Sequence, residues 1–266
     1  MKNRYPAVMK YFNFIRNNKL APTAVKLKVL ESCVTSALLH NCEAFGDAMP
    51  EELESLYFTL IKVALGVRKS TANDLVLIES GLLNIKAVIQ SRQYNFYQKY
   101  MSNLKPDSAR QSVFTQLRHH GTKFLQHYSN LFHTYESSQN IKKNYQQQLK
   151  DKIMNFSHND KHSKYKLYVS FNPELKPADL TKSYSYKFSR LRLSSHSMPV
   201  EMCRWNKMRK EIRLCNNCKI FGDETHYIYH CPTIDRSQLP DIPSSLHKLA
   251  DYDKLPTLLN VLSRYL

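Results

Sequence analysis

The sequence predicts a mostly α-helical protein with a separate small unit near its C-terminal end. Apolar residues recur every three to four positions through most of the 266 residues, which is the period of an amphipathic helix. Only the short stretch 164–169 alternates polar and apolar residues, as a strand or an extended linker does. Near the C-terminal end the helical pattern gives way to closely spaced cysteines and histidines, and these mark the small unit.

The first unit, residues 1–104, is predicted to be a bundle of helices. Residues 6–18 place apolar side chains on one helical face, and residues 24–41 repeat the pattern with Thr23 as the expected N-cap. A third helix begins at Pro50, has acidic residues in its first turn and ends at Gly66. After a polar loop at 70–74, residues 85–101 form a further helix. Their apolar faces predict one shared core.

The middle of the chain, residues 105–180, is predicted to be a helical, basic connector. The helical pattern continues from 108 to 153 but is richer in His, Gln and Asn. Residues 155–183 contain many lysines and two prolines, so they are read as a linking segment. The last unit, residues 181–266, begins with a predicted helix over 180–193. It makes a turn at Met198-Pro199 and ends with a helix over 255–266.

The spacing of cysteine and histidine between residues 215 and 231 is typical of a zinc site. The pattern is Cys215-Asn-Asn-Cys218, seven residues, His226, four residues and Cys231. Three thiolates and one imidazole complete a closed tetrahedral set, so the expected metal is a structural Zn²⁺ and not a catalytic one. His230 is a rival ligand that spacing alone does not exclude. The alternative is a group of buried free thiols.

The other three cysteines are scattered, which argues against a disulfide framework. Cys33, Cys42 and Cys203 have no regular spacing, and free thiols are typical of a reducing compartment. No apolar run approaches the length of a membrane span, and no secretory signal follows the basic N-terminus. We therefore expect a soluble intracellular protein, nuclear or cytoplasmic, with no membrane partner.

The positive charge is concentrated in the segment that leads into the cysteine cluster. The chain carries a net charge of +17, and residues 137–220 alone hold 18 Lys and Arg against 6 Asp and Glu, or +12. Such a field attracts polyanions, and the interleaved aromatic residues favour nucleic acid over a merely solvated surface. Trp205 is read either as a base-stacking residue or, more in line with its size, as the small core of the metal unit. The predicted phosphate contacts are Lys142, Lys143, Arg190, Arg192, Arg204, Arg209, Lys210 and Arg213.

These motifs resemble the C-terminal region of non-LTR (LINE-type) retrotransposon reverse transcriptases. The resemblance rests on Arg213-Leu-Cys215-Asn-Asn-Cys218 and on Gly222-Asp-Glu-Thr-His226-Tyr, which ends in Cys231-Pro232. Upstream, residues 38–46, 61–67 and 79–81 are similar to the segments that follow the family's palm, although His40, Asn41 and Phe45 depart from its usual residues. The resemblance implies a thumb-like helical region followed by a zinc knuckle. It assigns the metal to Cys215, Cys218, His226 and Cys231, and so favours His226 over His230.

The residues that polymerase chemistry requires are missing from this sequence. The family holds its two Mg²⁺ ions with a palm motif ending in Asp-Asp, and this chain contains no Asp-Asp pair. Asp251 and Asp253 lie beyond the cysteine cluster and are read as a solvated loop. We therefore expect no enzyme activity but a fragment that binds RNA or an RNA/DNA duplex, with a palm-containing reverse transcriptase fragment as a possible partner. The alternative is a zinc-stabilised interaction or scaffold domain from a domesticated or decaying transposon.

Overall fold

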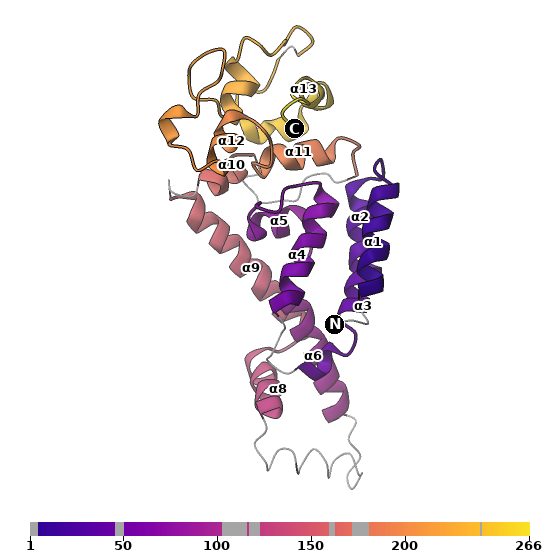
Figure 1. Ribbon diagram of the computed structural model, residues 1–266. Coiled ribbons are helices and arrows are strands. Elements are labelled where there is room, and N and C mark those ends of the chain that lie inside the picture. Colours follow the sequence, from indigo (N-terminus) through magenta and orange to yellow (C-terminus); the bar gives the residue numbers. More distant parts are fainter. Residues whose placement is uncertain are drawn as a thin grey trace.

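The expected mostly α-helical fold is confirmed. The computed structural model describes residues 5–45, 51–102, 116, 123–159, 163–171, 181–239 and 241–266. Within these ranges the β structure is limited to an isolated antiparallel bridge between Leu214 and Phe221. In Figure 1 the C-terminal unit lies above the N-terminal helices, and the long helix α9 (Ser138–Ser157) runs beside those helices toward the short helix α10 (Ser163–Phe171), which lies below the C-terminal unit.

The N-terminal helices match the predicted pattern closely. They are α1 (Tyr5–Asn17), α2 (Thr23–Val29), a π-helical continuation η2 (Leu30–Thr35), α3 (Ser36–Leu38), a 3-10 turn η3 (Cys42–Phe45), α4 (Glu51–Leu65), α5 (Asn73–Ser80) and α6 (Ile85–Ser102). Gly66 and Gly81 end α4 and α5 with φ values of +67° and +68°, in the left-handed region that glycine adopts without strain.

The predicted N-cap at Thr23 is wrong. The N-cap position of α2 is Pro22, which makes no side-chain hydrogen bond to the helix. Thr23 is buried, and its hydroxyl lies 2.9 Å from that of Ser185 in the C-terminal unit. The hydroxyl of Thr23 therefore makes a tertiary contact and not the local capping bond that the sequence predicted.

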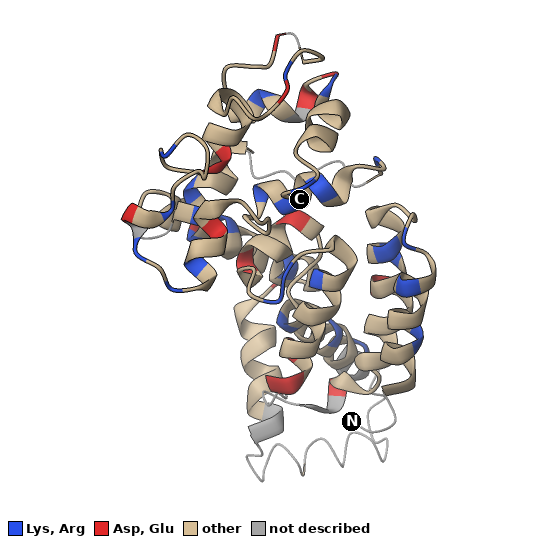
Figure 2. Cartoon of the chain, turned by 45° about the horizontal axis from the view of Figure 1, so that its top comes forward, with Lys and Arg blue, Asp and Glu red and all other residues tan. Residues whose placement is uncertain are grey.

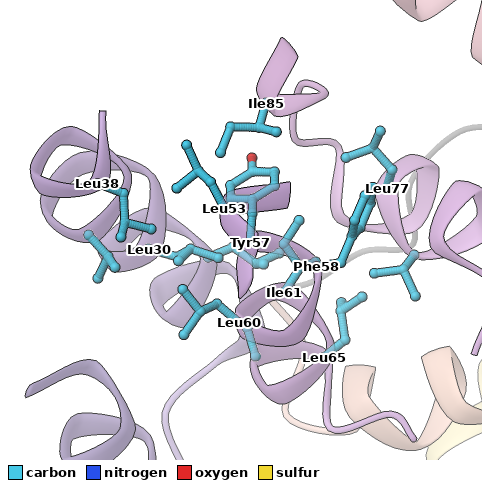
Figure 3. Packing of buried hydrophobic residues seen from close by; sticks show 14 of the residues in the cluster. Leu30, Leu38, Leu53, Tyr57, Phe58, Leu60, Ile61, Leu65, Leu77 and Ile85 are labelled. Atoms are coloured by element: carbon cyan, nitrogen blue, oxygen red, sulfur yellow. The ribbon is translucent and has the colours of Figure 1, made fainter. Parts of the chain in front are cut away.

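A first hydrophobic core holds these helices together. Figure 3 shows the side chains of α4 at its centre, with neighbours from the α2–α3 segment, from α5 and from the start of α6. The labelled residues are Leu30, Leu38, Leu53, Tyr57, Phe58, Leu60, Ile61, Leu65, Leu77 and Ile85. Ile153, Tyr168 and Leu193 from later segments join the same core, so helices of the predicted connector pack on the first unit.

The middle of the chain forms α8 (Lys123–Thr134), α9 (Ser138–Ser157) and α10 (Ser163–Phe171). Ser137 caps α9 by accepting a hydrogen bond from the amide of Asn140. The predicted helical pattern between 108 and 122 falls almost entirely outside the described residues, as do residues 160–162 and 172–180 of the predicted linking segment 155–183.

The strand or extended conformation considered for residues 164–169 is wrong, because this segment lies within α10. Tyr165, Tyr168 and Val169 pack on the first core, whereas Leu167 and Phe171 pack on a second one. A helix between two cores has apolar residues on both sides, and this hides the one-sided helical period and produces an apparent alternation.

The C-terminal unit surrounds the second core. It consists of α11 (Ser185–Arg192), α12 (Pro199–Trp205), the 3-10 turn η5 (Lys210–Ile212), the π-helical turn η6 (His226–His230), the 3-10 turn η7 (Leu246–Asp251) and α13 (Leu255–Val261). Pro199 is the first residue of α12, so the expected turn at this point is a helix start. The division at 104 and 180 stays a prediction. None of the described helices is both long enough and apolar enough to cross a membrane.

Candidate metal centre

A short hairpin positions the first two cysteines. The amide of Cys215 donates to the carbonyl of Ile220 at 2.7 Å, and the amide of Gly222 donates to Arg213 at 3.0 Å. Lys219 closes the turn with φ +57° and donates its amide to the carbonyl of Cys215 at 3.0 Å. This tight turn brings Cys218 back over Cys215.

A π-helical turn positions the other two predicted ligands. Asp223 precedes the two helical residues that lead into this turn, and its carboxylate accepts a hydrogen bond of 2.8 Å from the amide of His226. The amide of Cys231 donates to the carbonyl of His226 at 2.8 Å, so these two residues stand at the two ends of one π turn. The i and i+5 spacing of His226 and Cys231 therefore has a local structural reason.

The four side chains converge on one point. One ligand atom from each of Cys215, Cys218, His226 and Cys231 lies within 4.8 Å of the others, and no disulfide joins them. The sulfur of Cys231 lies 3.8 Å from that of Cys215 and 3.9 Å from that of Cys218. Sulfurs bound at 2.3 Å to a tetrahedral zinc are about 3.8 Å apart. The cluster therefore has the spacing that a metal ion requires.

The surroundings of His226 are a second, independent observation that favours metal binding. Its side chain is buried, and neither Nδ1 nor Nε2 has a hydrogen-bond partner. A buried ring nitrogen without a partner costs about 1–3 kcal/mol, and coordination to a metal removes that cost for one nitrogen. His230 is exposed and stands outside the cluster, so His226 and not His230 is the candidate ligand that the structure brings to the three cysteines.

The thiols of the cluster differ in how readily they ionise. Burial opposes ionisation of Cys215, but hydrogen bonds from the hydroxyl of Tyr227 and from the amides of Cys218 and Asn217 lower its pKa to about 5. Loss of surrounding water, followed by the neighbouring sulfurs of Cys215 and Cys231, raises the pKa of Cys218 to about 11. Three sulfurs at this distance become thiolates together only when a positive ion neutralises them.

Several side chains support the ligands from outside. Tyr227 donates to the sulfur of Cys215 at 3.4 Å, and the hydroxyl of Thr233 lies 2.9 Å from the sulfur of Cys231. Gly222 is buried, and a Cβ there would lie 3.0 Å from the amide nitrogen of Cys215 and 3.2 Å from the ring of Pro199. The hairpin therefore reaches α12 only because residue 222 has no side chain.

Arg236 fixes the end of the π turn, a role that the sequence analysis missed. Its guanidinium donates to the carbonyls of Tyr227, Ile228, Cys231 and Ile234 at distances of 2.7–3.1 Å. The carbonyl of Cys231 also accepts the amide of Ile234 at 3.2 Å. The planar guanidinium thus joins the end of the π turn to the loop that follows it. No spacing rule identifies such a residue, because the contact depends on the fold of the loop after Cys231.

Arg192 is not available to a phosphate, contrary to the prediction. Its side chain is only 2% exposed and forms an ion pair of 3.2 Å with Glu79, which is 0% exposed. Ser189 and Tyr168 donate to the same carboxylate at 2.6 and 3.2 Å. The arginine therefore joins α11 to α5 and α10 inside the protein.

Two more of the predicted contacts are engaged in holding the helices together. Arg190 donates to the carbonyl of Gly66 at 2.6 Å and to that of Leu266. Arg204 pairs with the buried Glu201 and donates to Ser163 at 2.7 Å. Both side chains are half-buried, so part of each remains at the surface.

The remaining predicted contacts lie at or near the surface. Lys143 and Arg209 are exposed, and Lys142 and Arg213 are half-buried. Lys210 begins η5, but its side chain lies outside the described part of the structure. Figure 2 shows Lys and Arg on the N-terminal helices, on the central helices and on the loops of the C-terminal unit.

Trp205 does not belong to the second core, so its predicted role as the small core of the metal unit is wrong, and its predicted role in base stacking stays a prediction. It is half-buried at the end of α12, and the guanidinium of Arg68 lies over its ring, 3.2 Å from the ring centre. The amide of Arg68 also donates to Ser195 at 2.8 Å. Trp205 thus takes part in the contact between the loop after α4 and the C-terminal unit.

Comparisons with protein-family models, curated proteins and solved structures find no match to this chain. The cluster of three cysteines and one histidine is therefore the feature from which a function is argued, and the family resemblance stays an expectation drawn from the motifs.

Proposed function

We propose that the cysteine and histidine cluster binds one structural zinc ion that orders the C-terminal unit. The support is the donor set, the sulfur spacing and the buried, unpartnered imidazole of His226. Four protein ligands leave no position for a water nucleophile, so the ion holds chain segments together and does no chemistry.

Removal of the metal tests this role. A chelator should melt residues near 200–240 and leave α1–α6 folded, because the first core contains no residue of the cluster. Hydrogen exchange followed by mass spectrometry resolves the two regions. Unchanged protection of residues 200–240 after chelation would contradict the role.

We propose further that the protein binds nucleic acid, RNA or an RNA/DNA duplex, mainly through the phosphate backbone. The observation that carries this proposal is the position of the metal centre at the end of a segment with a net charge of +12. The proposed surface contacts are Lys142, Lys143, Arg209 and Arg213, with the half-buried Arg190 and Arg204 at the edge.

The motifs quoted above are consistent with part of a non-LTR retrotransposon reverse transcriptase. On this proposal the stretch corresponds to the thumb-like helices and the zinc knuckle. It would act in the nucleus or cytoplasm alongside a palm-containing fragment, and by itself it would not polymerise DNA, because it lacks an Asp-Asp pair to hold Mg²⁺.

A salt titration tests nucleic-acid binding. Affinity for a labelled RNA should fall steeply as salt rises, with little dependence on sequence, because each neutralised phosphate releases counterions. Substitution of Arg209 by Gln should weaken binding and make the salt dependence shallower, by about 0.7 in the logarithmic slope on a single strand. Undetectable or salt-independent binding would remove the proposal.

A scaffold protein is the second candidate, favoured by the same basic surface facing an acidic protein partner. Capture of partners from lysate with and without nuclease separates the two functions. A partner that is lost with the nucleic acid supports the first function, and one that is retained supports the second.

A further inference from the structure

A cleft beside the metal centre has the lining of a nucleotide site. It has a volume of about 590 Å³ and lies between one face of α10, the helix α12 and the hairpin that carries Cys215 and Cys218. Small-molecule sites in proteins occupy about 300–1,000 Å³, so the cleft has room for one nucleotide and not for a duplex. Its lining residues include the cations Lys166, Arg204 and Arg213, together with Ser163, Ser170, Thr225 and Phe221.

Arg213 is the side chain in this cleft that lacks a counterion. A guanidinium has five N–H donors, and in the described part of the chain Arg213 makes one hydrogen bond, from Nη2 to the carbonyl of Met208 at 3.0 Å. Its Nε has no partner. No carboxylate among the described residues forms an ion pair with it, so its positive charge is left for a ligand.

The carboxylates that line the cleft are already engaged by the protein. Asp223 accepts the amide of His226 at 2.8 Å. Glu224 accepts His196 at 2.7 Å and Ser194 at 3.2 Å. An incoming anion therefore meets an unneutralised guanidinium, while the two acids are held by internal donors.

We propose that this cleft binds one unpaired nucleotide of a single-stranded RNA or DNA segment, with its phosphate on Arg213 and its base against Phe221. The proposal rests on the proposed nucleic-acid binding and adds to it a specific site and a preference for single strands. Phe221 is half-buried against the second core, so it presents a ring that is fixed before the strand arrives. A paired base cannot enter, because its faces are covered by stacking in the duplex.

Two charge-removing variants on the same hairpin test the proposal. Arg213→Gln removes the guanidinium that has no carboxylate partner in the cleft, and Lys219→Gln removes an exposed cation that does not line it. With the zinc-loaded full chain and a labelled ten-nucleotide uridine oligomer, we expect about a tenfold loss of affinity for Arg213→Gln and less than twofold for Lys219→Gln. For Arg213→Gln the loss of affinity should be smaller on duplex RNA, where Arg213 contacts only the phosphate backbone, than on the single strand.

A crosslinking measurement on the unaltered protein keeps the test independent of how the variants fold. A 4-thiouridine oligomer should crosslink to the peptide that contains Phe221 or to α10. Crosslinks elsewhere, equal losses for the two variants, or an equal loss for Arg213→Gln on duplex and on single strand would overturn the nucleotide site. Failure of the unaltered chain to bind any nucleic acid would instead overturn the proposed function itself.

Discussion

Replacement of Arg192 by Met tests whether this arginine stabilises the fold or contacts nucleic acid. The change leaves the carboxylate of Glu79 fully buried with hydroxyl donors but no cation. Breaking a buried ion pair from one side costs about 3–5 kcal/mol. The two hydroxyls retain part of the carboxylate's stabilisation, so we expect a loss near the lower end, about 3 kcal/mol in the free energy of unfolding.

Urea unfolding followed by circular dichroism measures this loss, with Arg16→Met as a control that removes an exposed charge. The double variant Arg192→Met with Glu79→Leu should be at least about 1.5 kcal/mol more stable than the single one, because no unpaired charge remains buried. The affinity of the folded protein for RNA should not change. A loss below about 1 kcal/mol together with weakened RNA binding would refute the reasoning.

Three further predictions follow from local contacts. Gly222→Ala should lower stability by about 1–3 kcal/mol in thermal or urea unfolding, because the added methyl group overpacks the contact with Pro199; an unchanged midpoint would contradict this. Arg236→Lys should lower the free energy of unfolding by about 2 kcal/mol, because an ammonium cannot reach all of the carbonyls that the planar guanidinium joins. The variant should also lose its metal more readily to a competing chelator. Equal metal retention by the variant and the unaltered protein would count against this role. Burial first, and the neighbouring Asp74 second, raise the pKa of Tyr165 to about 12 from an ordinary value of 10.0. The raised pKa contributes to the free energy of unfolding below pH 10, and this contribution is lost as the pH rises through about 12. Tyr165→Phe should therefore show a smaller fall in the free energy of unfolding across that range. An identical alkaline stability profile for the variant and the unaltered protein would disprove this.

The sequence predicted what depends on local chemistry. The end of α4 at Gly66 follows from glycine's access to positive φ, and the cysteines of the cluster follow from a spacing typical of metal sites. Spacing left His226 and His230 open, and the family resemblance favoured His226. The one-sided apolar pattern also identified α4 as a core helix, because that helix has a single buried face.

The parts that the sequence could not predict depend on tertiary contacts. Arg192 has the same local pattern as a surface arginine, and only its meeting with Glu79, from a distant helix, explains its burial. The helix α10 was obscured because it packs on two cores at once. Trp205 could not be assigned, since its partner Arg68 lies far away along the chain.

The metal content of the purified protein tests the central claim most directly. Elemental analysis after removal of loosely bound ions should find one zinc per chain, and Cys218→Ser or His226→Ala should abolish or strongly reduce it, whereas His230→Ala should not. Protein that contains no zinc, or that loses its zinc on replacement of His230 but keeps it on replacement of His226, would contradict the account.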